Sequence, residues 1–221
     1  MLTITDLYDL DHTLAAGYLR RFTYPWEALS GIKELILALG PELGEDYVER
    51  EPQVWVHRTA KIFPSAFLGA PCIIGARTEV RHCAFIRGSA LVGDDCVVGN
   101  SVELKNVILF DNVQVPHYNY VGDSVLGYKS HMGAGSITSN VKSDKTLVVL
   151  KDGERELFTN RKKVGAVLGD YVEVGCNSVL NPGTVIGRHS NIYPTSCVRG
   201  EIPENAIFKT GGRIVKKAEK V

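Results

Sequence analysis

The residues best suited to chemistry gather in one stretch of this sequence, from Val102 to Asn140. An imidazole such as that of His117 has an ordinary pKa near ~6.5, so at pH 7 it is largely unprotonated and can accept a proton. The Gly133-Ala134-Gly135 turn can present a backbone N–H to a developing oxyanion. A lone histidine is more often an ordinary surface residue, so the prediction of a reactive site depends on its neighbours.

Two cations near this stretch, Arg87 and Lys105, are candidates for binding a phosphate dianion. Arginine would do so through paired donors and lysine as a point charge, although both could equally be solvated residues at corners of the chain. The whole chain balances 25 basic against 25 acidic residues, so any anion site must be local. The balance argues against nucleic acid or an anionic membrane surface as a partner.

The remaining composition is that of a reduced, soluble protein without a metal centre. The apolar fraction is 44%, and the five cysteines are odd in number and lack any CxxC spacing, which favours structural thiols over disulfides. Only His117 and His131 lie near each other, and no third metal ligand is evident. The N-terminus is acidic where a signal peptide would be basic, and no run approaches ~20 apolar residues, so we expect a cytoplasmic protein that does not span a membrane.

A six-residue repeat predicts the elements that position these residues. In its first run, aliphatic residues follow one another at intervals of six: Val56, Ile62, Leu68, Ile74, Val80, Ile86, Val92, Val98 and Leu104. After a one-residue slip the repeat resumes at Leu109, after a second slip it resumes at Leu126, and after an interruption it returns at Leu168. A period of six fits neither an amphipathic helix nor a plain hairpin sheet, but it fits short strands separated by regular corners. Glycines such as Gly75 and Gly93 follow the aliphatic residue, where we expect them to provide φ > 0 at corners.

This repeat is typical of the left-handed parallel β-helix, an all-β fold in which three hexapeptides make one triangular coil. We predict this fold for residues 56–212, with residues 1–55 as a helical segment that caps or flanks it. A helical stripe begins after Pro25 and ends at Gly40. Two β-prone runs around Asp152-Gly153 predict an inserted hairpin arm at about 146–163, projecting from the prism. Residues 213–221 read as a solvated basic tail.

An ordered set of motifs runs through the repeat: Glu103-x-Lys105, His117 followed by Tyr120 and Gly122-Asp123, Gly133-Ala134-Gly135, and Ile137-Thr138-x-Asn140. With these motifs the chain resembles the acetyltransferase domain of the bacterial bifunctional enzymes that acetylate glucosamine-1-phosphate and then uridylylate the product. The resemblance covers roughly residues 56–212 and is ungapped from Arg87 to Asn140. This chain departs from the family by an insertion after Lys145, by His131 in place of an asparagine, and by Cys176 in place of a serine.

The resemblance implies transfer of acetyl from acetyl-CoA to the amine of an amino-sugar 1-phosphate, in UDP-N-acetylglucosamine biosynthesis. His117 would be the general base, and Asn140 would orient the amine. The implied substrate-binding residues are Arg87, Lys105, Tyr120, His131 and Lys145, and the implied cofactor-binding residues are Ala134, which offers its backbone N–H to the thioester carbonyl, Cys176, Pro194 and Arg213. The resemblance also implies a homotrimer with sites between subunits. No glycine-rich, lysine-bearing nucleotidyltransferase motif precedes the repeat, so we do not expect uridyl transfer.

Two other classes of function stay open. Some left-handed β-helices are zinc carbonic anhydrases, which need three histidines around one metal. Alternatively, the prism could be a non-catalytic sugar-nucleotide-binding or oligomerisation module related to UDP-N-acetylglucosamine diphosphorylases. The departures at His131 and Cys176 and the insertion keep this second alternative open.

Overall fold

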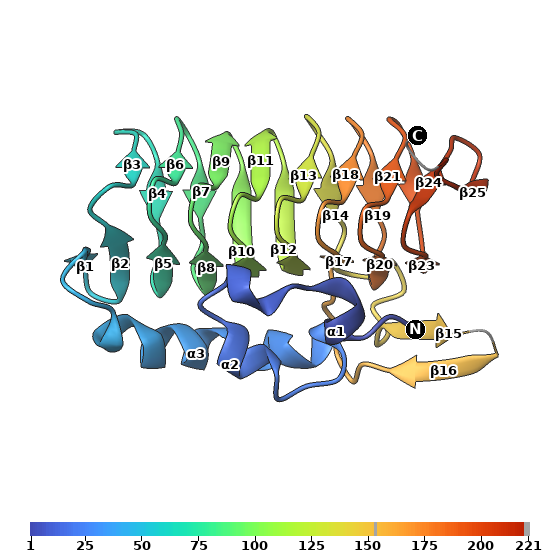
Figure 1. Ribbon diagram of the computed structural model, residues 1–221, viewed down its shortest axis with the longest axis horizontal. Helices are drawn as coiled ribbons and strands as arrows, with labels where there is room; N and C mark the ends of the chain where they lie inside the picture. The colour runs from blue at the N-terminus through green and yellow to red at the C-terminus, as the bar shows by residue number, and fades with distance from the viewer. Residues whose placement is uncertain (153, 219–221) are drawn as a thin grey trace.

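The computed structural model describes residues 1–152 and 154–218, and Figure 1 shows a prism of short strands with a helical segment along one side. Strands that lie 18 residues apart pair in parallel, as Val54 does with Cys72 and Cys72 with Ala90. Three six-residue repeats therefore complete one coil, and the chain is the predicted left-handed parallel β-helix. The helical N-terminal segment and the inserted hairpin of that prediction are also present.

The prism has three faces. The strands of the helix-covered face are β2 (Val54–His57), β5 (Cys72–Ile74), β8 (Ala90–Val92), the second halves of β10 (Glu103–Leu109) and β12 (Tyr120–Leu126), β17 (Ala166–Leu168), β20 (Thr184–Ile186) and β23 (Glu201–Ile202). The strands of the second face are β3 (Lys61–Ile62), β6 (Glu79–Val80), β9 (Val97–Asn100), β11 (Gln114–His117), β13 (His131–Met132), β18 (Glu173–Val174), β21 (Asn191–Ile192), β24 (Ala206–Phe208) and β25 (Ile214–Lys216). The strands of the third face are β4 (Phe67–Leu68), β7 (Phe85–Ile86), the first halves of β10 and β12, β14 (Ile137–Thr138), β19 (Val179–Leu180) and β22 (Cys197–Val198).

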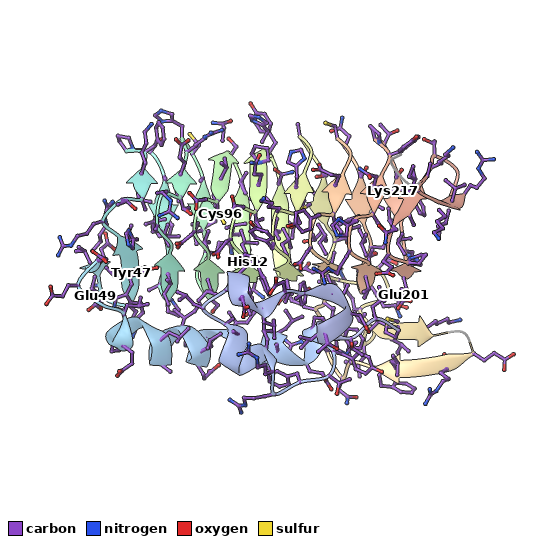
Figure 2. All side chains as sticks on the ribbon, in the orientation of Figure 1. His12, Tyr47, Glu49, Cys96, Glu201 and Lys217 are labelled. Atoms are coloured by element: carbon purple, nitrogen blue, oxygen red, sulfur yellow. The ribbon has the colours of Figure 1, made fainter. Side chains whose placement is uncertain are left out.

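The aliphatic repeat residues form the interior of the prism. Ile74, Val80, Ile86 and Leu104 are fully buried, as are their counterparts in the later coils. In Figure 2 the side chains fill the space between the faces, with Cys96 among them. One inward aliphatic side chain per hexapeptide is enough because each coil stacks its own side chain on those above and below.

The glycines of the repeat have a different role from the predicted one. Gly75 and Gly93 do not have positive φ; the corners are instead turned by non-glycine residues in the left-handed region, such as Arg77 and Asp95. A Cβ atom on Gly75 would overlap the backbone of Gly93 in the next coil. Glycine is therefore required here for the close approach of stacked coils, and the expectation about φ was wrong.

The two one-residue slips shorten two corners between the third and helix-covered faces. Val107 pairs with Ala90 and with Ser124, at spacings of 17 residues in place of 18. At these corners β10 and β12 continue from one face to the next, with Asn106 (φ 55°) and Asp123 (φ 49°) at the bends. The slips in the repeat therefore mark a local change in the prism wall.

The N-terminal segment lies along the helix-covered face, and does not close an end of the prism (Figure 1). Its elements are α1 (Ile4–Leu7), η1 (Leu10–His12), α2 (Ala16–Leu19), η2 (Pro25–Gly31), α3 (Ile32–Leu39) and η3 (Gly40–Glu42), and β1 (Tyr47–Glu51) then pairs antiparallel with β2. The outward residues of this face, including Ile73, Leu91, Ile108 and Val125, are apolar and buried beneath it. The labelled His12 and Glu201 lie where the segment meets the prism (Figure 2). The segment flanks the prism at this face because it buries these apolar outward residues.

Two expectations about peripheral elements need correction. The hairpin of β15 (Val149–Asp152) and β16 (Arg155–Phe158) does not simply project, because Val148 and Leu150 are buried and lie beside Gly183. The described part of the basic tail is largely exposed, as predicted, but it forms a strand, because β25 pairs antiparallel with β24 after a turn at Gly211-Gly212. Gly153 of the predicted hairpin turn and Lys220 of the tail lie outside the described residues, and the predicted domain bounds stay a prediction. Within the described chain, no helix is long and apolar enough to cross a membrane.

Candidate active site

The buried carboxylate of Asp123 is the centre of a polar network at the corner between the third and helix-covered faces. Its Oδ1 accepts hydrogen bonds from Lys105 Nζ at 2.9 Å and Asn106 Nδ2 at 3.0 Å. Its Oδ2 accepts from Asn140 Nδ2 at 2.7 Å and from Lys105 Nζ at 3.1 Å. Asp123 is 2% exposed, so this negative charge depends on Lys105 and the two amides for the stabilisation that water would otherwise give.

The same network fixes the orientation of Asn140. An ionised carboxylate only accepts hydrogen bonds, so the side chain of Asn140 must turn its amide nitrogen toward Asp123. That nitrogen also donates to the Tyr120 hydroxyl at 3.1 Å. The Oδ1 atom of Asn140 accepts no hydrogen bond from any described residue, and can therefore accept one from a ligand.

Tyr120 lies half-buried at the edge of this network. Burial raises the pKa of its phenol, although the hydrogen bond from Asn140 opposes the shift. The hydroxyl therefore keeps its proton at neutral pH. Because its oxygen already accepts from Asn140, the O–H is the part of the group that can be offered to a ligand.

Arg87 lies on the third face one coil before Lys105 and is held in an ion pair. Its Nη1 lies 2.7 Å from Oε1 of Glu103, and the guanidinium side chain is 46% exposed. Arg87 and Lys105 therefore occupy equivalent positions in successive coils, and each has a carboxylate partner. A bound phosphate would share these cations with Glu103 and Asp123.

His117 lies at the end of β11, at the corner between the second and third faces. Its side chain is exposed and makes no hydrogen bond to a described residue, while its backbone carbonyl accepts from Gly135 N at 3.0 Å. The buried Asn119 joins this corner to the next coil, because its Oδ1 accepts from His117 N and its Nδ2 donates to the Gly133 and Ser136 carbonyls. The histidine corner and the glycine-containing turn are thus one rigid unit.

The turn leaves one backbone donor unengaged. The backbone N–H groups of Gly133, Gly135 and Ser136 all donate to backbone carbonyls, and the Ala134 carbonyl accepts from Asn177 N at 2.8 Å. The Ala134 N–H has no hydrogen-bond acceptor within the described residues. It has the property that an oxyanion donor needs, namely a fixed direction and no competing partner.

His131, Cys176 and Pro194 come together on the second face, where they line a groove of about 360 Å³ with Gly133 and Tyr193. His131 Nδ1 lies 2.8 Å from Oε2 of Glu173 in the next coil. The predicted cofactor-side residues Cys176 and Pro194 are therefore neighbours. His131, predicted on the substrate side, lies with them and away from the Asp123 network.

Two predicted residues are not brought into either group. Lys145 is exposed in a turn with φ 60°, and Arg213 is exposed beside β25. Neither side chain makes a hydrogen bond or ion pair to the Asp123 network or to His117 among the described residues. In the part of the chain that the structure describes, no group of three His, Cys, Asp or Glu side chains could hold a metal ion.

Sequence reasoning assigned no role to four residues that organise the site: Glu103, Asn119, Asp123 and Glu173. Asp123 could have been found, because the second one-residue slip of the repeat falls on it. Asn119 and Glu173 do not lie at a slip of the repeat and carry no such signal.

Comparison with known proteins places this chain in a family. Residues 79–202 match the family described as the GMPPB C-terminal domain. The chain is 28% identical over 219 residues to the bifunctional sugar-1-phosphate nucleotidylyltransferase/acetyltransferase of Sulfurisphaera tokodaii, covering 94% of this chain and 55% of that protein. It is 29% identical over 206 residues to the bifunctional protein GlmU of Methanococcus maripaludis, covering 91% of this chain and 50% of that protein.

The chain thus spans about half the length of the curated relatives it matches. Among solved structures, a hexapeptide transferase family protein from Anaplasma phagocytophilum matches with a TM-score of 0.42 and 13% identity, over 75% of this chain and 79% of that chain. The matched segment, residues 79–202, contains both the Asp123 network and the His117 corner, and by that match the chain belongs to the GMPPB C-terminal domain family.

Proposed function

We propose that this chain transfers acetyl from acetyl-CoA to the amine of an amino-sugar 1-phosphate similar to glucosamine-1-phosphate. The observation that carries the proposal is the junction built by Asn119, which holds the exposed His117 and the unengaged Ala134 N–H in one rigid unit. A base and an oxyanion donor held together are what acyl transfer to an amine requires. The name of the Sulfurisphaera relative, which includes an acetyltransferase, supports the same reaction.

In the proposed reaction His117 accepts a proton from the sugar amine as the nitrogen attacks the thioester carbonyl. An amine beside electron-withdrawing oxygens has a pKa near the α-amino range of ~7.7 to 8.0, so a base is needed to keep it neutral in the site. The Ala134 N–H donates to the oxyanion of the tetrahedral intermediate. Collapse of that intermediate breaks the C–S bond, and the thiolate of coenzyme A takes a proton from the imidazolium.

On the substrate side we propose that the Oδ1 of Asn140 accepts a hydrogen bond from the sugar amine and that Tyr120 donates to the sugar phosphate. Arg87 and Lys105 would bind the phosphate. Lys145 and His131 lie apart from the Asp123 network of their own chain, so the proposal is that they contact substrate held by a neighbouring subunit. The network joining Lys105, Tyr120 and Asn140 through Asp123 supports this grouping. On the cofactor side, acetyl-CoA would be bound by Ala134, Cys176, Pro194 and Arg213.

The assembly and setting of the enzyme are also proposals. We propose a cytoplasmic homotrimer that acts in UDP-N-acetylglucosamine biosynthesis, with each site completed by a neighbouring subunit. Phe67 and Phe85 on the third face support a protein contact there, since they are 57% and 44% exposed and their ring centroids lie 5.5 Å apart. The division into a flanking segment (1–55), a transferase domain (56–212) and a C-terminal segment (213–221) belongs to the same proposal.

The test is a thiol-release assay with acetyl-CoA and glucosamine-1-phosphate, comparing the wild-type protein with His117→Ala. We expect turnover by the wild type and a fall of at least about 100-fold in the variant, the range of general-base catalysis. Because His117 is exposed and its side chain makes no hydrogen bond to a described residue, the variant should unfold at the wild-type temperature. Equal turnover by both proteins would refute the role of His117. Absence of thiol release from both would favour the non-catalytic binding module.

A further inference from the structure

A second groove opens where the inserted hairpin returns to the prism. It has a volume of about 530 Å³, within the size range of small-molecule sites. Its lining comes from three separate parts of the chain: Leu29 and Ser30 of the N-terminal segment, Ser89, Lys105, Asn106 and Asp123 of the coil corners, and Asn160, Arg161, Lys162 and Lys163 of the insertion. The groove therefore exists only because the insertion folds back beside the shortened corners.

The insertion is held at this place by backbone hydrogen bonds to residues of the candidate active site. Val164 N donates to the Asn140 carbonyl at 3.1 Å, and Gly165 N donates to the Asp123 carbonyl at 2.8 Å. An isolated antiparallel bridge also joins Lys163 to Val141. The cations of residues 161–163 are thus fixed within a few residues of the Asp123 network.

The charge in the groove is strongly unbalanced. Four cations line it, and Asp123 is the single carboxylate among the lining residues. That carboxylate is already occupied by Lys105, Asn106 and Asn140. Arg161, Lys162 and Lys163 form no ion pair with any carboxylate of the described chain, although the whole protein has no net charge. Three unpaired cations in one groove of a neutral protein favour binding of an anion there.

We propose that Arg161, Lys162 and Lys163, with Lys105, form a binding site for the phosphoryl group of a phosphorylated sugar. Arg161 can bind two phosphate oxygens through its paired donors, and the lysines add point charges. These three residues would be specificity determinants that favour a phosphorylated sugar over a neutral one. The identification of this sugar as the acetyl acceptor rests on the proposed function, but binding of the phosphoryl group does not.

The test measures binding by titration calorimetry, so that it does not depend on acetyl transfer. The probes are glucosamine-1-phosphate and glucosamine, and the variant is Arg161→Gln/Lys162→Gln/Lys163→Gln in the full chain. A matched control, Lys151→Gln/Arg155→Gln/Lys209→Gln, removes the same charge from exposed or partly exposed positions outside the groove. A single Lys162→Gln variant, at an exposed side chain, guards against a folding defect in the triple variant.

We expect the wild type to bind glucosamine-1-phosphate at least about tenfold more tightly than glucosamine, because hydrogen bonds to charged groups commonly contribute that much. The triple variant should lose at least about tenfold of this affinity and the single variant a smaller part, whereas the control should stay within about twofold. Unchanged affinity in the folded triple variant, or equal losses in variant and control, would overturn the proposal. If the wild type binds the phosphorylated sugar through these cations but releases no thiol, the proposed function fails while the groove stands. If the triple variant still releases thiol with the KM of the wild type, the proposed function stands and the groove proposal fails.

Discussion

Replacement of Asp123 by Asn tests whether the Asp123 network positions the candidate site. Asn is the appropriate replacement because Asp123 has φ 49°, a conformation that asparagine tolerates and alanine does not. The change replaces one carboxylate oxygen with an NH2 group. Both oxygens of Asp123 accept from donors, so the introduced NH2 must face either Lys105 and Asn106 or Lys105 and Asn140.

The size of the effect follows from the burial of the two partners. Breaking a fully buried ion pair by removing one charge costs about 3–5 kcal/mol. Lys105 is 28% exposed, so water can replace part of the lost interaction, and one oxygen acceptor remains. We therefore expect the free energy of unfolding to fall by about 2 kcal/mol, between the values for exposed and buried pairs. At about 2–4 °C per kcal/mol for a chain of this size, the melting temperature should fall by roughly 4–8 °C.

Asp95→Asn is the matched control, because Asp95 also turns a corner with positive φ (54°) and also accepts from a cation. Its ion pair with Arg77 is exposed on both sides, at 38% and 58%, so its loss should cost much less stability than the loss of the buried Asp123 pair. Calorimetric melting and kcat/KM for acetyl transfer should be measured on both variants. We expect only Asp123→Asn to lose kcat/KM, by about tenfold or more, because only there does Asn140 lose its orientation. Equal melting temperatures for the two variants, or full activity of Asp123→Asn, would refute this reasoning.

Three further predictions concern the fold and its response to pH. Gly99→Ala should yield little folded protein, because a Cβ atom at this position overlaps the Pro116 carbonyl; soluble expression and circular dichroism measure this. The control is Gly17→Ala, which has no atom within 4 Å of its Cβ and should melt within a few degrees of the wild type. Asn119→Ala should lower the free energy of unfolding by about 1–3 kcal/mol in urea titrations, because it leaves the buried Ser136 carbonyl without its donor and the His117 N–H without its acceptor. It should also lower kcat more than it changes KM. Burial raises the pKa of Tyr47 to about 12, so the unfolded chain, with its tyrosine pKa near ~10, releases this proton first as the pH rises. The stability that Tyr47 contributes is therefore complete below pH ~10 and is lost between about pH 10 and 12. Tyr47→Phe should reduce the slope of the unfolding free energy against pH in that window, and an unchanged slope would contradict the assignment.

The architecture could be predicted from the sequence because the fold is local and repetitive. Each coil contacts mainly the coils before and after it, so residues such as Ile74 and Val80 report their own burial through their spacing alone. The same logic failed for Gly75, whose role depends on the backbone of the next coil and not on its own φ. It failed again for the C-terminal segment, because the edge of β24 that pairs with β25 has no sequence signal of its own.

The candidate site was also predictable only in part from the sequence. His117, Lys105, Tyr120 and Asn140 were identified by their order in motifs, and the structure joins the last three in one network. The predicted proximity of Lys145 was not found, because that residue lies in an exposed turn before the insertion. Cations from the far end of the insertion occupy the groove beside Lys105 instead.

The sequence by itself determined the coil, its inward residues and the shortened corners, because a six-residue period is a property of neighbouring residues. Only the tertiary structure decided which polar groups meet. Asp123 contacts Lys105, 18 positions away, and Asn140, 17 positions away, because stacked coils place residues about one turn apart beside each other. The insertion returns beside both through hydrogen bonds of backbone groups, which are the same for every residue type and leave no trace in composition or spacing.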